Sequence, residues 1–226
     1  MAHEDLPFVV DEHRAHFPDG FFARLGPRFL TAYTATYLAT PCARAYIAET
    51  GGQPTGFLVG VIDPAAHRGQ LVRKHGTRLA LRACAALSLR PLLALHFLRT
   101  RLSRYCRKLL PARYARGKEE PGPARRDGAT AVLSHVAVNS RARSLRLGSA
   151  LIERFIQDAA AAGCARVSLV TAAGPDGAGR YYERLGWRFA GSTRTPDGRL
   201  FLTYEYALYT PFPDDPRLRY FQGPAQ

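Results

Sequence analysis

The chain has few cysteines and no spacing typical of a disulfide or metal site. Its four cysteines are scattered, without a Cys-x-x-Cys pair or a Cys/His cluster. We therefore expect reduced thiols, a cytoplasmic location and no metal, zinc included. Residues 1–12 are acidic and polar and lack the apolar core of a signal peptide.

A long uninterrupted hydrophobic run is also missing. Residues 79–98 come closest, but Arg82, Arg90 and His96 interrupt them and Pro91 breaks them, so we do not expect a membrane span. The length of 226 residues and the hydrophobic fraction of 46% are typical of one soluble globular domain with an elaboration.

Acidic residues are scarce in one segment. Residues 64–128 hold 16 Lys or Arg and only 3 Asp or Glu, whereas the whole chain has a net charge of +14. Nearly all of the excess positive charge therefore lies in this segment. We expect two or three amphipathic helices with basic faces there, one of them with a leucine stripe, and a flexible loop at 117–128. The stripe consists of Leu92, Leu95, Leu98 and Leu102.

The most informative pattern lies after this segment. Residues 131–138 are an apolar run typical of a buried strand, residues 139–147 contain three arginines, and residues 148–162 have helical periodicity. The first turn of a helix has amide N–H groups without intrahelical partners and carries partial positive charge. Gly148 lacks a Cβ where a ligand would approach the backbone. The pattern predicts a phosphate-binding loop.

The other elements follow from periodicity and turn residues. We expect an exposed lead-in at 1–16, a helical turn at 21–25, a helix at 27–39 and a hairpin of strands at 44–49 and 55–62. Further strands are predicted at 165–172, 187–194 and 200–208, with a short helix at 177–185. Residues 209–226, with three prolines, are expected to form an irregular tail on the surface.

Residues 131–208 resemble the C-terminal half of a GCN5-related N-acetyltransferase (GNAT). That family has an Arg/Gln-x-x-Gly-x-Gly/Ala loop, which residues 143–148 match except that Arg146 stands at the first glycine. The family's later Tyr-Glu-Lys-Leu-Gly-Phe is similar to residues 182–187, and a frequent asparagine before it aligns with Pro175. The resemblance implies an α/β fold with a mixed central sheet flanked by helices. We expect one domain, residues 1–226, with the basic helical insertion, residues 64–128, between the third and fourth strands.

The resemblance also implies acetyl-CoA as co-substrate and transfer of an acetyl group to a primary amine by direct attack in a ternary complex. In the family a backbone N–H of the central strand polarises the thioester, here that of Val136 or Ala137, and the tyrosine matching Tyr182 acts as the acid. The acceptor pocket usually lies near the N-terminal helices. The cofactor-binding residues implied are Val136, Ala137, Val138, Arg143, Ser144, Leu145, Arg146, Leu147, Gly148, Ser149 and Ala150.

The general base stays open. In the family the base positions on the central strand match Val132 and Ser134, and neither carries a basic group. Regular alternation would place Ser134, Val136 and Val138 on one face and His135 on the other. The alternatives are His135, a carboxylate on a neighbouring strand (Glu49, Asp63 or Glu205), a water chain, or an amine bound already neutral.

Three functions remain as alternatives. The first is an N-acetyltransferase acting on a small-molecule or peptide amine, including an acidic one, as a monomer or homodimer. The second is a degenerate, non-catalytic domain that binds coenzyme A. The third is a module that binds an anionic membrane surface or nucleic acid through residues 64–128, although no nucleic-acid motif is present there.

Overall fold

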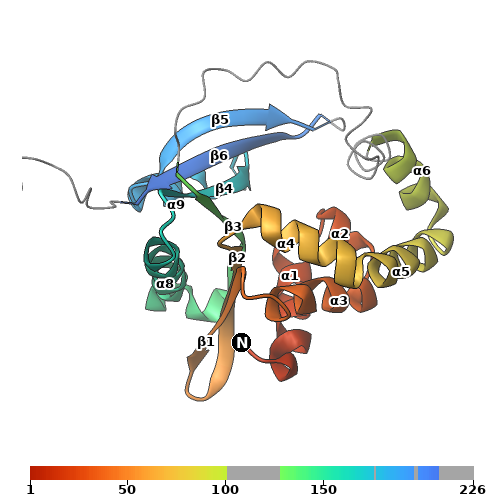
Figure 1. The fold of residues 1–226 in the computed structure, drawn as a ribbon, viewed down its shortest axis with the longest axis horizontal. Coiled ribbons are helices and arrows are strands. Elements are labelled where there is room, and N and C mark those ends of the chain that lie inside the picture. Colours follow the sequence, from red (N-terminus) through yellow and green to blue (C-terminus); the bar gives the residue numbers. More distant parts are fainter. Residues whose placement is uncertain (101–127, 176, 196–197, 209–226) are drawn as a thin grey trace, which may run out of the picture.

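The computed structural model describes residues 1–100, 128–175, 177–195 and 198–208 (Figure 1). Its centre is a six-stranded sheet with the order β1-β2-β3-β4-β6-β5. The strands are β1 (Ala43–Thr50), β2 (Gln53–Val61), β3 (Thr130–Val138), β4 (Arg166–Ala172), β5 (Arg188–Arg194) and β6 (Leu200–Ala207). Only the β3–β4 pair is parallel; the other four pairs are antiparallel. The mixed sheet flanked by helices is the predicted fold class.

Helices cover both faces of the sheet (Figure 1). On one face, α8 (Leu147–Ala161) and α9 (Gly179–Arg184) pack on a core that includes Phe155, Leu133 and Val167. On the other face, α1 (Leu6–His16) and α3 (Pro27–Leu38) pack on a second core that includes Phe57 and Val59, with η1 (His3–Asp5) preceding α1 and α2 (Phe21–Arg24) preceding α3. Two separate cores thus sandwich the central strands.

The expectation of an exposed lead-in at residues 1–16 is wrong. Most of this segment is α1, which buries Leu6, Val9, Val10 and His13. These residues follow the spacing i, i+3, i+4, i+7, which is the apolar stripe of a helix that packs on a core. The polar residues between them are the outward face of the same helix.

Residues 64–100 form α4 (Pro64–Gln70), the π-helical turn η2 (Leu71–His75), α5 (Gly76–Ser88) and α6 (Pro91–Thr100). Asp63 caps the first helix, because its Oδ1 accepts the N–H groups of Ala65 and Ala66 at 3.0 and 2.9 Å. The helices lie between β2 and β3, the second and third described strands. The predicted position between the third and fourth strands is therefore wrong.

A small third core joins these helices to α2 and α3. It consists of buried Leu25, Phe29, Leu79 and Leu93 with partly buried neighbours. The predicted leucine stripe does not supply this contact, because Leu92 and Leu95 are exposed while Leu93 is buried. The side chain of Leu98, Leu102, the loop expected at 117–127 and the tail at 209–226 lie outside what the structure describes.

Candidate functional site

β3 and β4 pair only near their N-terminal ends. The parallel register runs from Thr130↔Arg166 to Leu133↔Leu169, although β3 continues to Val138 and β4 to Ala172. Within the described residues, the second part of β3 therefore has no ladder partner on its β4 side. An extended ligand can bind backbone groups there, as a peptide adds to a sheet edge.

Alternation identifies which residues present their backbone to that side. The N–H of Asn139 donates to the carbonyl of Thr55 in β2, at 2.8 Å, and Ala137 pairs with Phe57 of the same strand. Since neighbouring residues of a strand direct their backbone groups to opposite sides, the groups of Val136 and Val138 face β4. Ala137 presents its amide to β2 instead. The roles assigned to these three residues stay predictions.

The loop after β3 is tied down at its start. Asn139 accepts the N–H of Ala142 at 2.9 Å, and its side-chain Nδ2 donates to Oε1 of Glu12 on α1 at 3.0 Å. The 3-10 turn η3 (Ser140–Leu145) follows and leads into α8. The Glu12–Asn139 contact was missed by sequence reasoning, because it joins residues 127 positions apart.

Arg146 adopts a left-handed backbone conformation, with φ 56° and ψ 19°. It is the one residue other than glycine with positive φ in the described part of the chain. This conformation favours glycine, and a Cβ there costs about 1–2 kcal/mol. The backbone thus has the shape that glycine gives the family loop, and Arg146 adopts it under strain at the entrance to α8.

The first turn of α8 meets β3 and α9. A Cβ built on Gly148 would lie 3.2 Å from the Tyr181 hydroxyl and 3.6 Å from Cγ2 of Val138. Ser149 Oγ shares a hydrogen bond of 3.1 Å with the same hydroxyl. The sequence patterns did not predict this polar contact between Tyr181 and α8. Residues 143–150 therefore form one continuous loop and helix start, of which the side chains of Arg143 and Ser144 are not described.

Tyr182 lies deeper than Tyr181. Its ring packs against those of Trp187 at 5.6 Å and Tyr204 at 6.4 Å, and the residue is buried. Burial, assisted by the neighbouring Tyr181, raises the pKa of Tyr182 to about 12. The phenol therefore keeps its proton at neutral pH. Its assignment as the acid stays a prediction.

A β-bulge changes the faces of β3. Val59 pairs with His135 and Gly60 with Leu133, so Ser134 is the extra residue. Leu133 and Val136 belong to the α8 side, whereas Ser134 interacts with Tyr37 of α3 and His135 contacts His13 of α1. The expectation that Ser134 shares a face with Val136 and Val138, opposite His135, is therefore wrong. Ser134 and His135 both face α1 and α3.

His135 lies in an aromatic cluster. Its ring centroid is 4.5 Å from that of His13 and 5.6 Å from that of Phe17. Burial, with a smaller contribution from His13, lowers the pKa of His135 to about 3, and burial lowers that of His13 to about 4. Both rings are neutral at neutral pH. Of the carboxylates considered as bases, Asp63 caps α4 and Glu205 pairs with Arg166 at 3.7 Å, while Glu49 is exposed.

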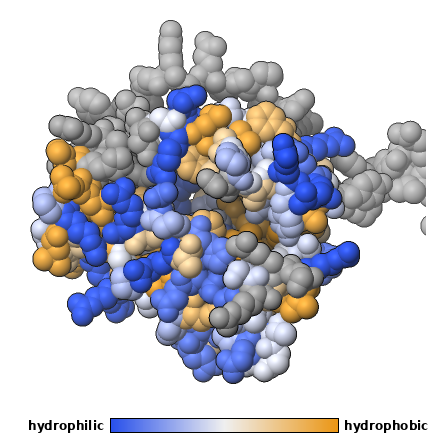
Figure 2. All heavy atoms as spheres, turned by 180° about the vertical axis from the view of Figure 1, so that it is seen from behind, coloured by the Kyte–Doolittle hydropathy of each residue, from blue (hydrophilic) through white to orange (hydrophobic). Residues whose placement is uncertain are grey.

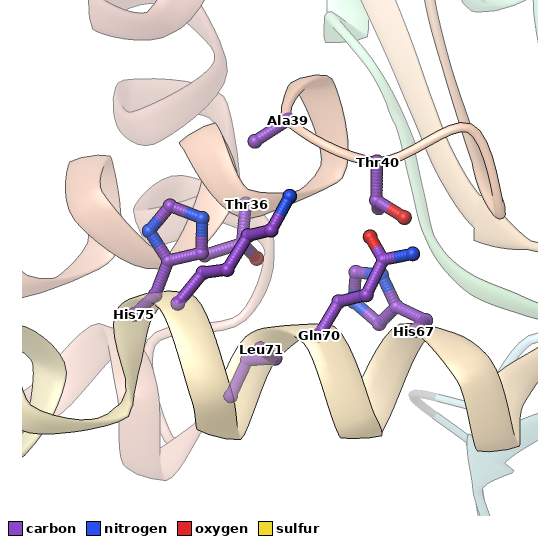
Figure 3. Close-up of a pocket in the computed structure, with 8 residues that line it drawn as sticks. Thr36, Ala39, Thr40, His67, Gln70, Leu71 and His75 are labelled. Carbon is purple, nitrogen blue, oxygen red and sulfur yellow. The ribbon is translucent and has the colours of Figure 1, made fainter.

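Hydroxyls and a further histidine continue from the bulge. Tyr37 and Tyr33 share a hydrogen bond of 3.0 Å between their hydroxyls, and the Tyr37 ring lies 5.1 Å from that of His67. The buried Nδ1 of His67 has no hydrogen-bond partner among the described residues. It borders a small pocket between the end of α3 and α4 (Figure 3). The lining residues are Thr36, Ala39, Thr40, His67, Gln70, Leu71, Lys74 and His75.

Within the described residues, no group of three or more His, Cys, Asp or Glu could hold a metal ion. Cys42, Cys84 and Cys164, the cysteines that the structure describes, are free thiols.

Comparison with known proteins gives one family. Residues 104–187 match the model of the acetyltransferase (GNAT) family. None of the curated proteins matches the chain. Among solved structures, a GNAT-family acetyltransferase from Desulfovibrio desulfuricans is 15% identical, with 90% of this chain and 94% of that chain covered and a TM-score of 0.50.

Two further solved structures have the same fold. An N-acetyltransferase from Staphylococcus aureus Mu50 is 15% identical, with coverages of 92% and 96% and a TM-score of 0.53. An aminoglycoside 6'-N-acetyltransferase complexed with coenzyme A is 12% identical, with coverages of 92% and 93% and a TM-score of 0.53. At these identities the likeness shows the fold.

Proposed function

Because the chain carries a GNAT acetyltransferase domain and has the GNAT fold, we propose that it transfers an acetyl group from acetyl-CoA to a primary amine. The observation that carries this proposal is the early end of β3–β4 pairing, at Leu133 and Leu169, beside the first turn of α8. An open strand edge suits an extended pantetheine arm, and a helix N-terminus suits its pyrophosphate.

The residues present fit coenzyme A. Gly148 leaves space beside the Tyr181 hydroxyl, because a Cβ at this position would lie 3.2 Å from that oxygen. Arg146 has the loop conformation that glycine favours. We propose that the N–H groups at the start of α8 hold the pyrophosphate and that Val136 and Val138 hold the pantetheine. When bound, acetyl-CoA supplies an activated thioester carbonyl for attack by the amine.

The protein's own groups then handle two protons. The Tyr182 hydroxyl, held protonated by burial, is proposed to donate to the leaving thiolate. For the proton that the amine loses, Ser134 Oγ, with Tyr37 behind it, is proposed to act as a relay to water, because the ring of His135, with its pKa lowered to about 3, is too weak a base at neutral pH. A fixed backbone amide of β3 facing β4 is proposed to stabilise the developing oxyanion.

The acceptor is proposed to be an amine that also carries an anionic group. The chain has a net charge of +14, so polycationic amines are repelled and acidic ones attracted. A cavity of about 340 Å³ between η1, α3 and α5 has basic lining groups His3, His75, Arg78 and Arg82 and no lining carboxylate. A cytoplasmic location is also proposed, on the ground of the free thiols Cys42, Cys84 and Cys164.

The first test is calorimetric titration of the full chain with acetyl-CoA, followed by thiol release with anionic and cationic amines of matched size. Saturable one-site binding and faster release with the anionic amines are expected. Absence of binding at millimolar acetyl-CoA contradicts the proposal. Binding without thiol release from any amine supports the non-catalytic alternative instead.

Tyr182→Phe tests the acid. Removing the hydroxyl should slow kcat by about 10²-fold, within the range of general acid catalysis, because the thiolate loses its proton donor. Binding of acetyl-CoA, measured by calorimetry, should stay within about twofold of the wild type, since the ring packing remains. Tyr206→Phe, on β6 at the edge of the same core, is the control that removes a tyrosine hydroxyl and keeps that of Tyr182. An unchanged kcat for Tyr182→Phe sinks the assignment.

A further inference from the structure

Large apolar side chains are exposed in one part of the molecule. The structure describes nine exposed large hydrophobic residues, and five of them lie within residues 72–95. Leu81 is 72% exposed, and Leu89 and Leu92 are each 83% exposed. We name this set the leucine surface; it consists of Val72, Leu81, Leu89, Leu92 and Leu95.

The leucine surface is the outward side of α5 and α6. On α5, Leu79 is buried and Ala83, Ala86 and Leu87 pack on the third core, so Leu81 lies on the opposite side of the helix. Leu89 and Leu92 flank the bend at Pro91, and Leu95 lies one turn beyond Leu92 on the same side of α6. A surface helix normally presents polar residues at such positions.

Positive charge is concentrated in the segment that carries these leucines. Residues 64–100 include seven Lys or Arg and no Asp or Glu. Lys74 follows Val72 closely, and Arg78 and Arg82 flank Leu81 in the sequence. Figure 2 shows hydrophobic residues among strongly hydrophilic ones on the side of the molecule where α5 and α6 lie. An apolar helix face bordered by cations is typical of a helix that lies in a membrane interface.

We propose that the leucine surface binds an anionic lipid membrane, with α5 and α6 lying along the interface. The leucines enter the boundary between headgroups and acyl chains, and the flanking cations contact acidic headgroups. None of the helices in the described ranges could span a membrane.

Charge favours a membrane over a second copy of the chain. A symmetric dimer would place the same carboxylate-free segment against itself, and its like charges would repel. A bilayer instead offers both the negative charge and the apolar phase that the surface lacks in water. It also needs no complementary groove for side chains that project separately from the outer sides of two helices.

Flotation of the full chain with two kinds of vesicles tests the proposal. One kind is phosphatidylcholine alone, and the other is an equal mixture of phosphatidylcholine and phosphatidylserine. Binding is expected to the mixed vesicles and to weaken with salt. The double variant Leu89→Ser/Leu92→Ser should lower the partition coefficient at least about tenfold, since two apolar side chains no longer enter the lipid. Both positions are exposed, so the fold is retained.

Matched variants separate apolar insertion from charge. Val170→Ser/Leu200→Ser removes two exposed apolar side chains from the sheet and should leave binding unchanged. Arg68→Gln/Arg73→Gln, at exposed positions of the same segment, should weaken binding about tenfold, whereas Arg184→Gln/Arg188→Gln, with the same loss of net charge, should weaken it much less.

Three results overturn the proposal. The first is no binding to the mixed vesicles. The second is binding that the Leu89/Leu92 variant leaves intact, which would mean attraction by charge alone. The third is a dimer in sedimentation velocity that this variant abolishes while vesicles bind nothing, which would assign the surface to a second copy. None of these readouts uses acetyl transfer, so the proposal stands or falls apart from the proposed function.

Discussion

α8 and α5 have similar lengths, 15 and 13 residues, but they place their apolar side chains differently. α8 buries Leu151, Ile152, Phe155 and Ala159 against the sheet. α5 fully buries only Leu79 and leaves Leu81 exposed. The comparison teaches that α8 derives its position from the core beneath it, whereas α5 has apolar area left over for a partner. The loop before α8 therefore leads into a helix that is packed on the core. The segment containing α5 has an exposed apolar side that can bind a partner.

The largest effect is expected from removing Phe155, the largest buried side chain of α8. Phe155 is fully buried, and a Cβ on Gly60 of β2 would lie 2.5 Å from its ring. Phe155→Ala should lower the free energy of unfolding by about 3–5 kcal/mol, measured by urea denaturation. Leu79→Ala should cost about 2 kcal/mol, because α5 sits on a smaller core. Equal costs would show that the two helices are held alike.

Acid should lower the stability of the fold through the histidines between the sheet and α1. His13 is neutral in the fold with its pKa lowered to about 4 from 6.5, so below pH 6.5 the unfolded chain binds more protons than the folded one. Its stabilising effect is complete above pH 6.5 and is lost as the pH falls toward 4, by about 3 kcal/mol. Urea midpoints between pH 7 and pH 4 measure this loss. His13→Phe should flatten only part of the profile, because His135, with its pKa lowered to about 3, remains in place, and His3→Phe, at an exposed position, should leave the profile unchanged.

A large side chain at the start of α8 should weaken the binding of acetyl-CoA while the fold is retained. Gly148→Trp would fill the space beside Tyr181 and Val138, so the affinity for acetyl-CoA should fall about 100-fold or more, measured by calorimetry. Gly69→Trp on α4 is the matched control, because its nearest neighbour is the flexible Arg73 side chain. Similar losses for both variants would place the site elsewhere.

The smallest effect concerns Arg146. Glycine accepts its left-handed backbone without strain, so Arg146→Gly should raise the free energy of unfolding by about 1 kcal/mol. Arg146→Ala removes the guanidinium but keeps a Cβ, so it should bring no such gain. Thermal or urea unfolding of the two variants decides between backbone strain and charge as the property that matters at this position.

Sequence patterns predicted the region around α8 well, because it obeys local rules. The strand at 131–138, the basic loop and the helix at 148–162 correspond to β3, η3 and α8 within a residue or two. Arg146, whose backbone is left-handed, also stands at the position where the family loop has its first glycine. Here hydrophobic periodicity and the loop pattern agree, and each is set by residues close together in the chain.

What failed depends on distant contacts. Residues Leu6–His16 have the periodic spacing of a helix that packs on a core. The polar residues between the apolar ones led instead to the prediction of an exposed segment. The bulge at Ser134 follows from pairing with β2, across residues far apart in sequence, and no pattern within β3 reveals it. The direction of the α6 stripe was likewise set by Leu93, a single leucine that packs on the third core.

The bulge has a consequence for anyone who aligns this chain with its relatives. Ser134 is one residue more than the ladder with β2 needs, so a relative with a regular strand has one residue fewer at this point. An alignment without a gap there would equate inward residues with outward ones through the rest of β3. Deleting Ser134 from the chain would instead restore a regular ladder and leave His135 facing the N-terminal helices, because Leu133 and His135 would then alternate. The bulge is therefore a point at which the strand can gain or lose one residue while the neighbouring side chains keep their faces of the sheet.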